Sequence, residues 1–429
     1  MFFQRGSRII SRRIPLKLVT SRCRGISTTN PLLRAGFAPI GRQNIVGYAL
    51  LGLTAVGLWW NFYPHNPYPP SISKYLRKAS WEEIKTKDYE KSIEYYKEAL
   101  VECDKLDYSP LDDKLTGIEI KIAEMYEHLG NKSEETKIYL SLLEKLYNGV
   151  KLATSEEEKV RLMKRDLSVL IKMVENMDAN ATVKRNFLQM HINLVQGEFE
   201  KSVPSLSHIM AKGNENIFMN TASPQYKSLM KDVGETSKHF GNIRDEFLMA
   251  RDLYTEICRE SNMIDDAIHT KMITIGWMVL MGMDQEDVLM SQANLAGLMY
   301  MKAENVEYSI LKLKDGEKTE ANDKTIEMLS QRYKHILAMS ESYYQTVLDK
   351  SKLIKASFPV GQGRDAKTLQ VTLLSLYGLG VINLHRGDNE MASRFLNQSK
   401  ILAEEYDFLE MLEECNRELK KLPPPNIQA

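Results

Sequence analysis

The sequence predicts an all-α protein in which a helical repeat array, an α-solenoid, follows a single N-terminal transmembrane helix. Beyond Ser71, apolar residues recur at intervals of three and four and almost never alternate, which is the period of amphipathic helices. Several segments share one spacing of small and aromatic residues, as repeat proteins do. Near the start of the chain, residues 45–60 contain no charged side chain, as a membrane-spanning helix requires.

Charge is divided unevenly between the start of the chain and its body. Residues 1–80 contain 12 Lys and Arg and no acidic residue, so the remainder of this formally neutral chain carries a net charge of −12. An acidic body argues against nucleic acid as the main partner, because binding to the phosphate backbone depends on clustered Lys and Arg. The four cysteines are widely spaced, which supports neither a zinc site nor a disulfide framework.

The first element, residues 1–27, has the composition of a mitochondrial presequence. It is rich in Arg, Ser and Thr and lacks acidic residues. Its end, Arg24-Gly25-Ile26-Ser27, resembles the Arg-x-apolar-Ser pattern that the matrix processing peptidase cleaves. A disordered basic tail is the alternative. After cleavage, residues 28–44 would form a short matrix segment.

The second element is a predicted transmembrane helix over residues 45–63. About twenty helical residues rise far enough to cross a hydrocarbon core of about 30 Å. Trp59 and Trp60 near its C-terminal end are typical of the aromatic belt at a membrane interface. Residues 64–72 form a Pro-rich spacer that cannot continue the helix. The alternative is a buried core helix. A presequence followed by one such span predicts an inner-membrane protein whose body faces the intermembrane space.

The third element is a helical domain over residues 73–420, closed by a tail over residues 421–429. Its clearest repeats are residues 73–105, 116–147, 236–260 and 372–406. They place small, aromatic and aliphatic residues at the spacing of a helix pair and its turn: Tyr89, Ser92, Tyr96 and Ala99; Ile122, Ala123, Tyr126 and Gly130; Ala250 and Tyr254; Leu379, Gly380, Gly387, Ala392 and Ser399. This spacing resembles the tetratricopeptide (TPR) repeat, in which small residues let paired helices approach closely.

Two regions of the body lack this spacing. Residues 150–240 keep helical periodicity without the repeat signature, and residues 302–326 have the composition of a polar insertion or long loop. Seven of the 22 methionines lie between Lys271 and Met301. They indicate either a methionine-rich core or an adaptable surface for partners.

The sequence offers no recognisable catalytic constellation. It contains no HExxH, GxSxG or GxxxxGK[ST] motif, and the GQGR stretch at residues 361–364 lacks the strand and helix that flank a phosphate-binding loop. We therefore expect neither an enzyme nor a cofactor or metal site.

A TPR array presents the first helix of each pair to an inner groove that accepts peptide segments. The TPR resemblance implies the following groove residues: Arg77, Trp81, Ile84, Ile120, Glu124, Glu127, Tyr377, Val381 and Leu384. Trp81 and Tyr377 would be the aromatic anchors.

A presequence, one span, the spacer NFYPHNPYPPSISKYLRKA and divergent TPRs together resemble the fungal TPR-containing substrate-adaptor subunit of the mitochondrial inner-membrane i-AAA protease, or a paralogue. This resemblance implies a non-catalytic adaptor in protein quality control. Its partners would be the i-AAA protease, its other adaptor, unfolded or inner-membrane client proteins, and the lipid bilayer through residues 45–63. An assembly factor for a respiratory-chain complex and an outer-membrane preprotein receptor are the alternatives.

Overall fold

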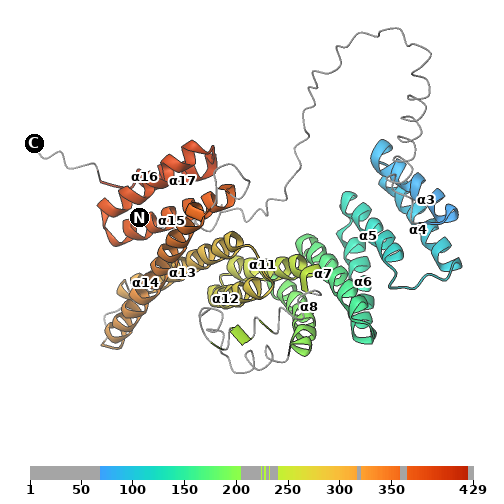
Figure 1. Ribbon diagram of the computed structural model, residues 1–429, viewed down its shortest axis with the longest axis horizontal. Coiled ribbons are helices and arrows are strands. Elements are labelled where there is room, and N and C mark those ends of the chain that lie inside the picture. The colour runs from blue at the N-terminus through green and yellow to red at the C-terminus, as the bar shows by residue number, and fades with distance from the viewer. Residues whose placement is uncertain are drawn as a thin grey trace, which may run out of the picture. The chain divides into compact units, whose positions relative to one another are not determined.

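The structure is a computed structural model that describes residues 68–203, 240–315, 320–357 and 365–423, with isolated positions at 224, 227, 228 and 231. Every regular element within these ranges is a helix (Figure 1). The predicted all-α class is therefore confirmed, and successive helices joined by short connections are consistent with a helical repeat array. The described residues fall into two compact units whose boundary, between residues 118 and 119, lies inside helix α5.

The first unit is built on a helix pair. Helix α3 (Pro70–Trp81) continues into a π-helical turn, η3 (Glu82–Thr86), and packs on α4 (Tyr89–Lys105). Small residues let the two helices meet: Ala79 and Ser92 are fully buried, and the Ser92 hydroxyl donates to the Ala79 carbonyl at 3.0 Å. Asp88 caps α4 by accepting a hydrogen bond from the Lys91 amide. The small residues of segment 73–105 thus lie at the crossing of two helices.

The second unit begins with the end of α5 (Asp113–His128), followed by α6 (Lys132–Leu152), α7 (Glu156–Asn176) and α8 (Ala181–Ser202). Gly130 has φ +70° between α5 and α6, a left-handed conformation that glycine adopts without strain. Helix α7 packs on both α6 and α8.

Helices α11 (Arg244–Glu260) and α12 (Ile264–Leu280) extend this part of the chain. A short 3-10 turn, η5 (Phe240–Asn242), precedes α11, which packs on α7, α8 and α12. Segment 236–260 therefore contributes one long helix whose partners lie outside it. Three aromatic rings pack together where α8, α11 and α12 meet. The ring centroids of Phe199, Phe247 and Trp277 are 5.2 to 5.6 Å apart.

The longest helices are α13 (Gln285–Lys314) and α14 (Glu320–Ser357), which pack along one another (Figure 1). The expectation of a polar loop over residues 302–326 is wrong for the described part of that stretch. Ala303, Val306 and Ile310 are buried at helical spacing, and the neighbouring Glu304 and Glu307 are half-buried on α13. These residue types are good helix formers, so polarity alone did not indicate a loop.

The body closes with α15 (Asp365–Arg386), α16 (Asn389–Glu405) and α17 (Leu409–Leu419). As in the first unit, a small residue joins the pair, because the Ser399 hydroxyl on α16 donates to the Leu373 carbonyl on α15 at 3.2 Å. Gly387 has φ +83° in the turn between them. The methionines of residues 271–301 divide between buried positions, such as Met278 and Met299, and half-buried ones.

No helix of the described residues combines the length and apolarity needed to cross a membrane. The predicted presequence, matrix segment and span at residues 45–63 lie outside the described residues, as does the GQGR stretch.

Candidate functional site

An open groove of about 580 Å³ lies between α14, α15 and α16. It is lined by Gln345, Leu348, Lys352, Thr372, Leu376, Met391, Arg394, Phe395, Gln398, Ile401 and Leu402. Helix α16 contributes six of these residues at spacings of three and four, so one continuous face of this helix forms a wall. The adjacent face of α16, with Ala392, Leu396, Ser399 and Ala403, is buried.

Close helix packing beneath the groove fixes the positions of its walls. A Cβ atom on Gly380 would lie 2.6 Å from the Leu396 side chain and 3.2 Å from its backbone nitrogen, so α15 and α16 approach at glycine distance. A Cβ atom on Gly378 would lie 2.4 Å from the ring of Tyr344 on α14. These two glycines bring three helices together, and the groove follows the seam that they leave.

The floor of the groove is apolar and its rim is polar. Leu348 and Leu376 are buried, while Phe395 and Leu402 are half-buried against the same core. Ile401, in contrast, is 61% exposed. The exposed Ile401 beside the half-buried Phe395 and Leu402 suits an apolar peptide segment, which would remove this surface from water.

The polar side chains of the rim can orient such a segment. Gln398 and Arg394 are exposed on α16. Lys352 is 3.6 Å from Asp349, an exposed pair that screening weakens, and Gln345 donates to the same carboxylate at 3.1 Å. The groove therefore offers apolar contact, amide hydrogen bonds and a small excess of positive charge.

The groove residues implied by the TPR resemblance occupy different environments. Arg77, Trp81 and Ile84 are exposed on α3 and η3, where a partner could reach them. Glu124 forms ion pairs with Lys121 and Lys172. Although burial opposes ionisation, these lysines hold the pKa of Glu124 below its ordinary value.

Most of the remaining residues from that list are less exposed. Ile120 and Leu384 are half-buried, and Glu127 is exposed. Tyr377 and Val381 are each 6% exposed and belong to the core, so they offer no open contact surface in this structure. The physical reason is that both α13 and α14 pack on α15 and cover its inner face.

Sequence reasoning missed the outer wall of the groove. Met391, Phe395 and Leu402 form a second apolar stripe on α16, beside the small residues that mark its crossing with α15. A helix with two apolar stripes can pack on its paired helix through one stripe and contact another molecule through the second. The second stripe of α16 is visible in the sequence as apolar residues at helical spacing.

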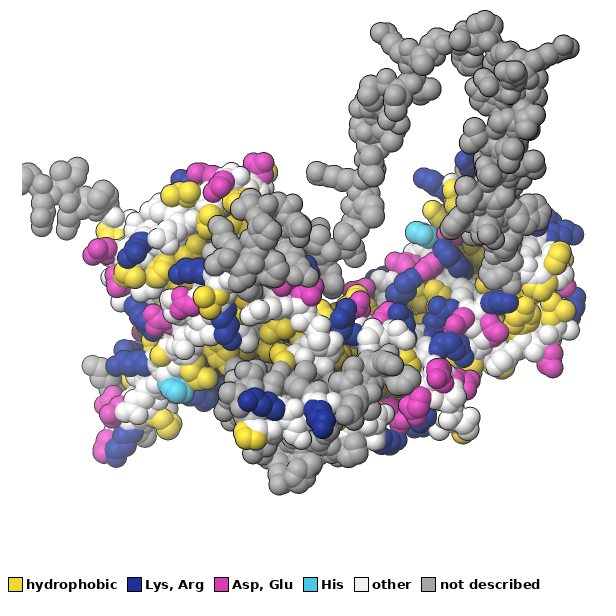
Figure 2. Space-filling view, viewed as in Figure 1, with side chains coloured by type: hydrophobic (Ala, Val, Ile, Leu, Met, Phe, Trp, Pro, Cys, Tyr) yellow, Lys and Arg dark blue, Asp and Glu magenta, His cyan; other side chains and the backbone are white. Residues whose placement is uncertain are grey.

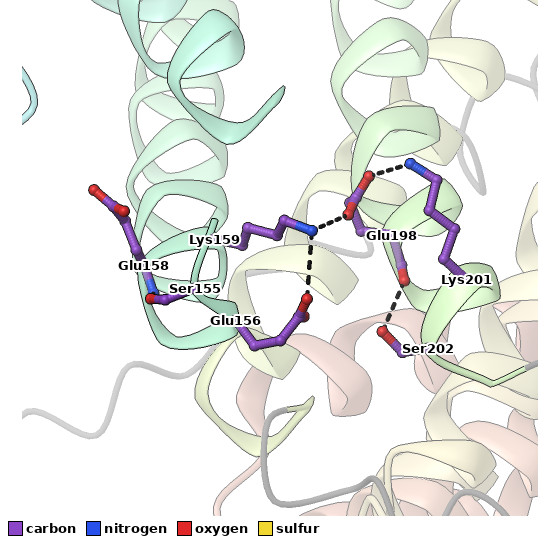
Figure 3. A network of polar contacts seen from close by, with 7 residues as sticks. All are labelled: Ser155, Glu156, Glu158, Lys159, Glu198, Lys201 and Ser202. Atoms are coloured by element: carbon purple, nitrogen blue, oxygen red, sulfur yellow. Dashed lines mark hydrogen bonds and ion pairs between the residues drawn. The ribbon is translucent and has the colours of Figure 1, made fainter. Parts of the chain in front are cut away.

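A polar network joins α7 to α8 at some distance along the chain from the groove (Figure 3). Lys159 on α7 lies 3.2 Å from Glu198 on α8 and 3.3 Å from Glu156, and Lys201 also contacts Glu198. Burial alone would raise the pKa of Glu198, but the hydrogen bonds from Lys201 and Lys159 hold it below its ordinary value. Ser155 caps α7 by accepting from the Glu158 amide at 3.1 Å. These contacts position helices, and their acids and bases are already paired with one another.

The same two helices share a buried polar pair. His191 Nδ1 lies 2.7 Å from Asp166 Oδ2, and both side chains are almost fully buried. Burial raises the pKa of the Asp166 carboxyl, and the hydrogen bond from His191 acts in the opposite direction. Within the described ranges, no group of three or more His, Cys, Asp and Glu residues is arranged to hold a metal ion.

On the face shown in Figure 2, charged side chains of both signs are interspersed with apolar ones over the described surface.

Comparison with known proteins places these observations in a family. A profile described as the MGR3 middle domain matches residues 151–283, which contain α7, α8, α11 and α12. "Protein MRG3-like" from Saccharomyces cerevisiae is 31% identical over 411 residues, covering 88% of this chain and 87% of the relative. The "Mitochondrial inner membrane i-AAA protease supercomplex subunit MGR3" from the same organism is 30% identical over 409 residues, covering 87% of this chain and 81% of the relative. Because this similarity extends over most of all three chains, the chain belongs to the MGR3 family.

Proposed function

We propose that this protein is a non-catalytic, membrane-anchored adaptor that binds unfolded or membrane protein clients and presents them to the i-AAA protease of the mitochondrial inner membrane. The observation that carries the proposal is the apolar groove between α14, α15 and α16, in a chain that belongs to a family with a named i-AAA supercomplex subunit. The relative's name favours the inner-membrane protease over an outer-membrane receptor.

The groove supports client binding rather than catalysis. Its apolar floor matches side chains that unfolding exposes, and its polar rim can bond to a peptide backbone without selecting one sequence. An adaptor needs this breadth of recognition, because its clients share exposed apolar segments rather than a common motif.

The association with the protease is tested by immunopurification of the full-length protein in mild detergent. We expect an AAA protease to co-purify in stoichiometric amount. Recovery of a folded bait without any AAA protease would refute this part of the proposal, and co-purification of a respiratory-chain complex instead would support an assembly factor.

Client binding is tested at the groove with a photoreactive amino acid at Gln398, using casein as a permanently unfolded probe. The Ile401→Asp variant should reduce crosslinking roughly tenfold, because it places a charge where an apolar contact is expected. Leu409→Asp is the matched control, since Leu409 is 68% exposed on α17 and lies outside the groove. Equal crosslinking by the two variants would remove the groove from the proposal and leave the protease association standing.

The proposed orientation puts the body in the intermembrane space. In isolated mitochondria, protease should digest the body only after swelling ruptures the outer membrane. Digestion on intact mitochondria would instead indicate an outer-membrane receptor.

A further inference from the structure

Helix α3 and the turn η3 carry a stripe of exposed cationic and apolar side chains. Lys74, Arg77, Lys78, Trp81 and Ile84 recur at intervals of three and four and are all exposed. The opposite face of α3 is buried against α4 through Ile72, Ser73 and Ala79. We name these five exposed residues the basic-aromatic stripe.

None of the five residues of the stripe is acidic. Glu82 and Glu83 lie between Trp81 and Ile84 in η3 and keep their negative charges, but their carboxylates bond to the Thr86 and Tyr96 hydroxyls at 2.6 and 2.8 Å. Among the described residues, the cations of the stripe make no ion pair. Lys78 instead lies over the ring of Tyr95, a contact that keeps its positive charge.

The partner helix α4 shows that this charge pattern is local. Its exposed face alternates in sign, with Glu90, Glu94 and Glu98 among its lysines. Lys91 pairs with Asp88 at 2.7 Å there. The charges of α4 are thus of both signs, whereas α3 contains three cations and no acidic residue.

Trp81 and Ile84 are 59% and 65% exposed, so their apolar surface is in contact with water unless a partner covers it, and such contact is unfavourable. A tryptophan on the same exposed helix face as lysine and arginine matches a lipid interface, where the ring lies at headgroup depth and the cations bind lipid phosphates. A peptide groove does not require an unbroken series of cations, so the charge favours an anionic surface.

The position of the stripe in the chain brings it to such a surface. Pro70, the first residue of α3, follows Tyr63, the end of the predicted span, by seven residues. Seven residues extend at most about 25 Å, so α3 cannot lie far from the bilayer if residues 45–63 span it.

We propose that the basic-aromatic stripe docks on anionic lipid headgroups, with Trp81 and Ile84 inserted at the interface. This inference rests on the membrane anchor of the proposed function and adds a second, peripheral membrane contact to it. The contact would fix the orientation of the first helix pair at the membrane.

The test uses the full-length chain reconstituted into phosphatidylcholine vesicles with and without phosphatidylglycerol, both containing brominated lipid that quenches nearby tryptophan. The difference in emission between the wild type and Trp81→Phe isolates Trp81 from Trp59, Trp60 and Trp277. We expect about half of the Trp81 emission to be quenched in anionic vesicles, because interfacial insertion brings the ring near the acyl chains.

Reversing the charges of the stripe tests whether these cations bind the anionic vesicles, or whether the net charge of the whole protein is responsible. Lys74→Glu, Arg77→Glu and Lys78→Glu together should abolish Trp81 quenching, since each cation near an anionic surface strengthens binding by about fivefold. The control reverses three lysines of α4, at residues 91, 97 and 105, which changes the net charge equally on the other helix of the pair. The control should leave quenching intact.

Two outcomes would overturn the inference in different ways. If the chain floats with the vesicles but Trp81 is not quenched, the anchor stands and the stripe faces a protein partner or water. If the chain does not float with the vesicles, the anchor proposal fails together with the lipid contact.

Discussion

Replacing Gly378 with alanine should destabilise the α13–α15 region because one methyl group has no room there. A Cβ atom would lie 2.4, 2.5 and 2.8 Å from three ring carbons of Tyr344, whereas ordinary contacts begin near 3.4 Å. The ring would have to move by about 1 Å to restore contact distance. Tyr344 is 5% exposed, and its hydroxyl already lies 3.3 Å from the position of a Cβ on Gly297. The ring is therefore held between two glycines and cannot retreat freely.

The expected magnitude combines two opposing effects. Overpacking a well-filled core costs about 1–3 kcal/mol, and the rigid ring places Gly378→Ala near the upper end of that range. Alanine is favoured over glycine in a helix by about 1 kcal/mol, which offsets part of the cost. A net loss of about 2 kcal/mol corresponds to a decrease in melting temperature of roughly 3 °C for the unit of residues 119–429, because the entropy of unfolding grows with chain length.

The assay is thermal unfolding followed by circular dichroism on matched variants. Gly197→Ala is the control, because nothing lies within 4 Å of a Cβ at that position of α8, and it should be neutral or stabilising by up to about 1 kcal/mol. In a Tyr344→Ala background, Gly378→Ala should no longer destabilise, since the clashing ring is gone. If Gly378→Ala melted at or above the wild type, the close approach of α14 and α15 would be refuted.

Three further perturbations test other contacts. Glu307→Gln should lower the melting temperature at pH values below the ordinary pKa of histidine and lose this effect as pH rises. The reason is that the hydrogen bond to Glu307 raises the pKa of His385, and the charged pair stabilises the fold only while the ring is protonated. An equal decrease in melting temperature at pH values below and above that range would contradict this prediction. Asp166→Ala should cost about 3 kcal/mol in a urea titration by leaving His191 buried without its partner, whereas replacing both residues by leucine should cost much less. Asp388→Ala should cost about 1 kcal/mol by removing the N-cap of α16, and Asp388→Asn should retain most of the stability in the same titration.

The sequence predicted best where helix packing depends on residue size. Ser92 and Ser399 stand out in the sequence because only small residues fit at a close helix crossing, and both donate to a carbonyl of the paired helix. The turn glycines at 130 and 387 were recognisable for a similar reason, since their positive φ angles strain other residues.

The middle of the chain was harder to predict because it is held by other contacts. Its helices meet through the aromatic cluster of Phe199, Phe247 and Trp277 and through the pair of His191 and Asp166. Such pairings depend on which helices become neighbours, and no spacing within one helix encodes them. For the groove on α14–α16, the second apolar stripe of α16 is visible in the sequence, but the walls from α14 and α15 that face it are not.

The stability of the last helices and the shape of the groove depend on the same close contacts. Gly380 sets the distance between α15 and α16, and Gly378 sets the distance between α14 and α15, while the groove follows the seam between these three helices. Because tightly packed interiors transmit a displacement instead of absorbing it, a methyl group at either glycine should move a wall of the groove as well as weaken the fold. If the groove binds clients, Gly380→Ala should therefore reduce casein crosslinking even at temperatures where the protein remains folded. Gly197→Ala, in a helix that does not line the groove, should leave crosslinking unchanged. Unfolded clients can adapt to a binding surface, but the array must hold that surface in a fixed geometry, and these glycines allow the close packing that does so.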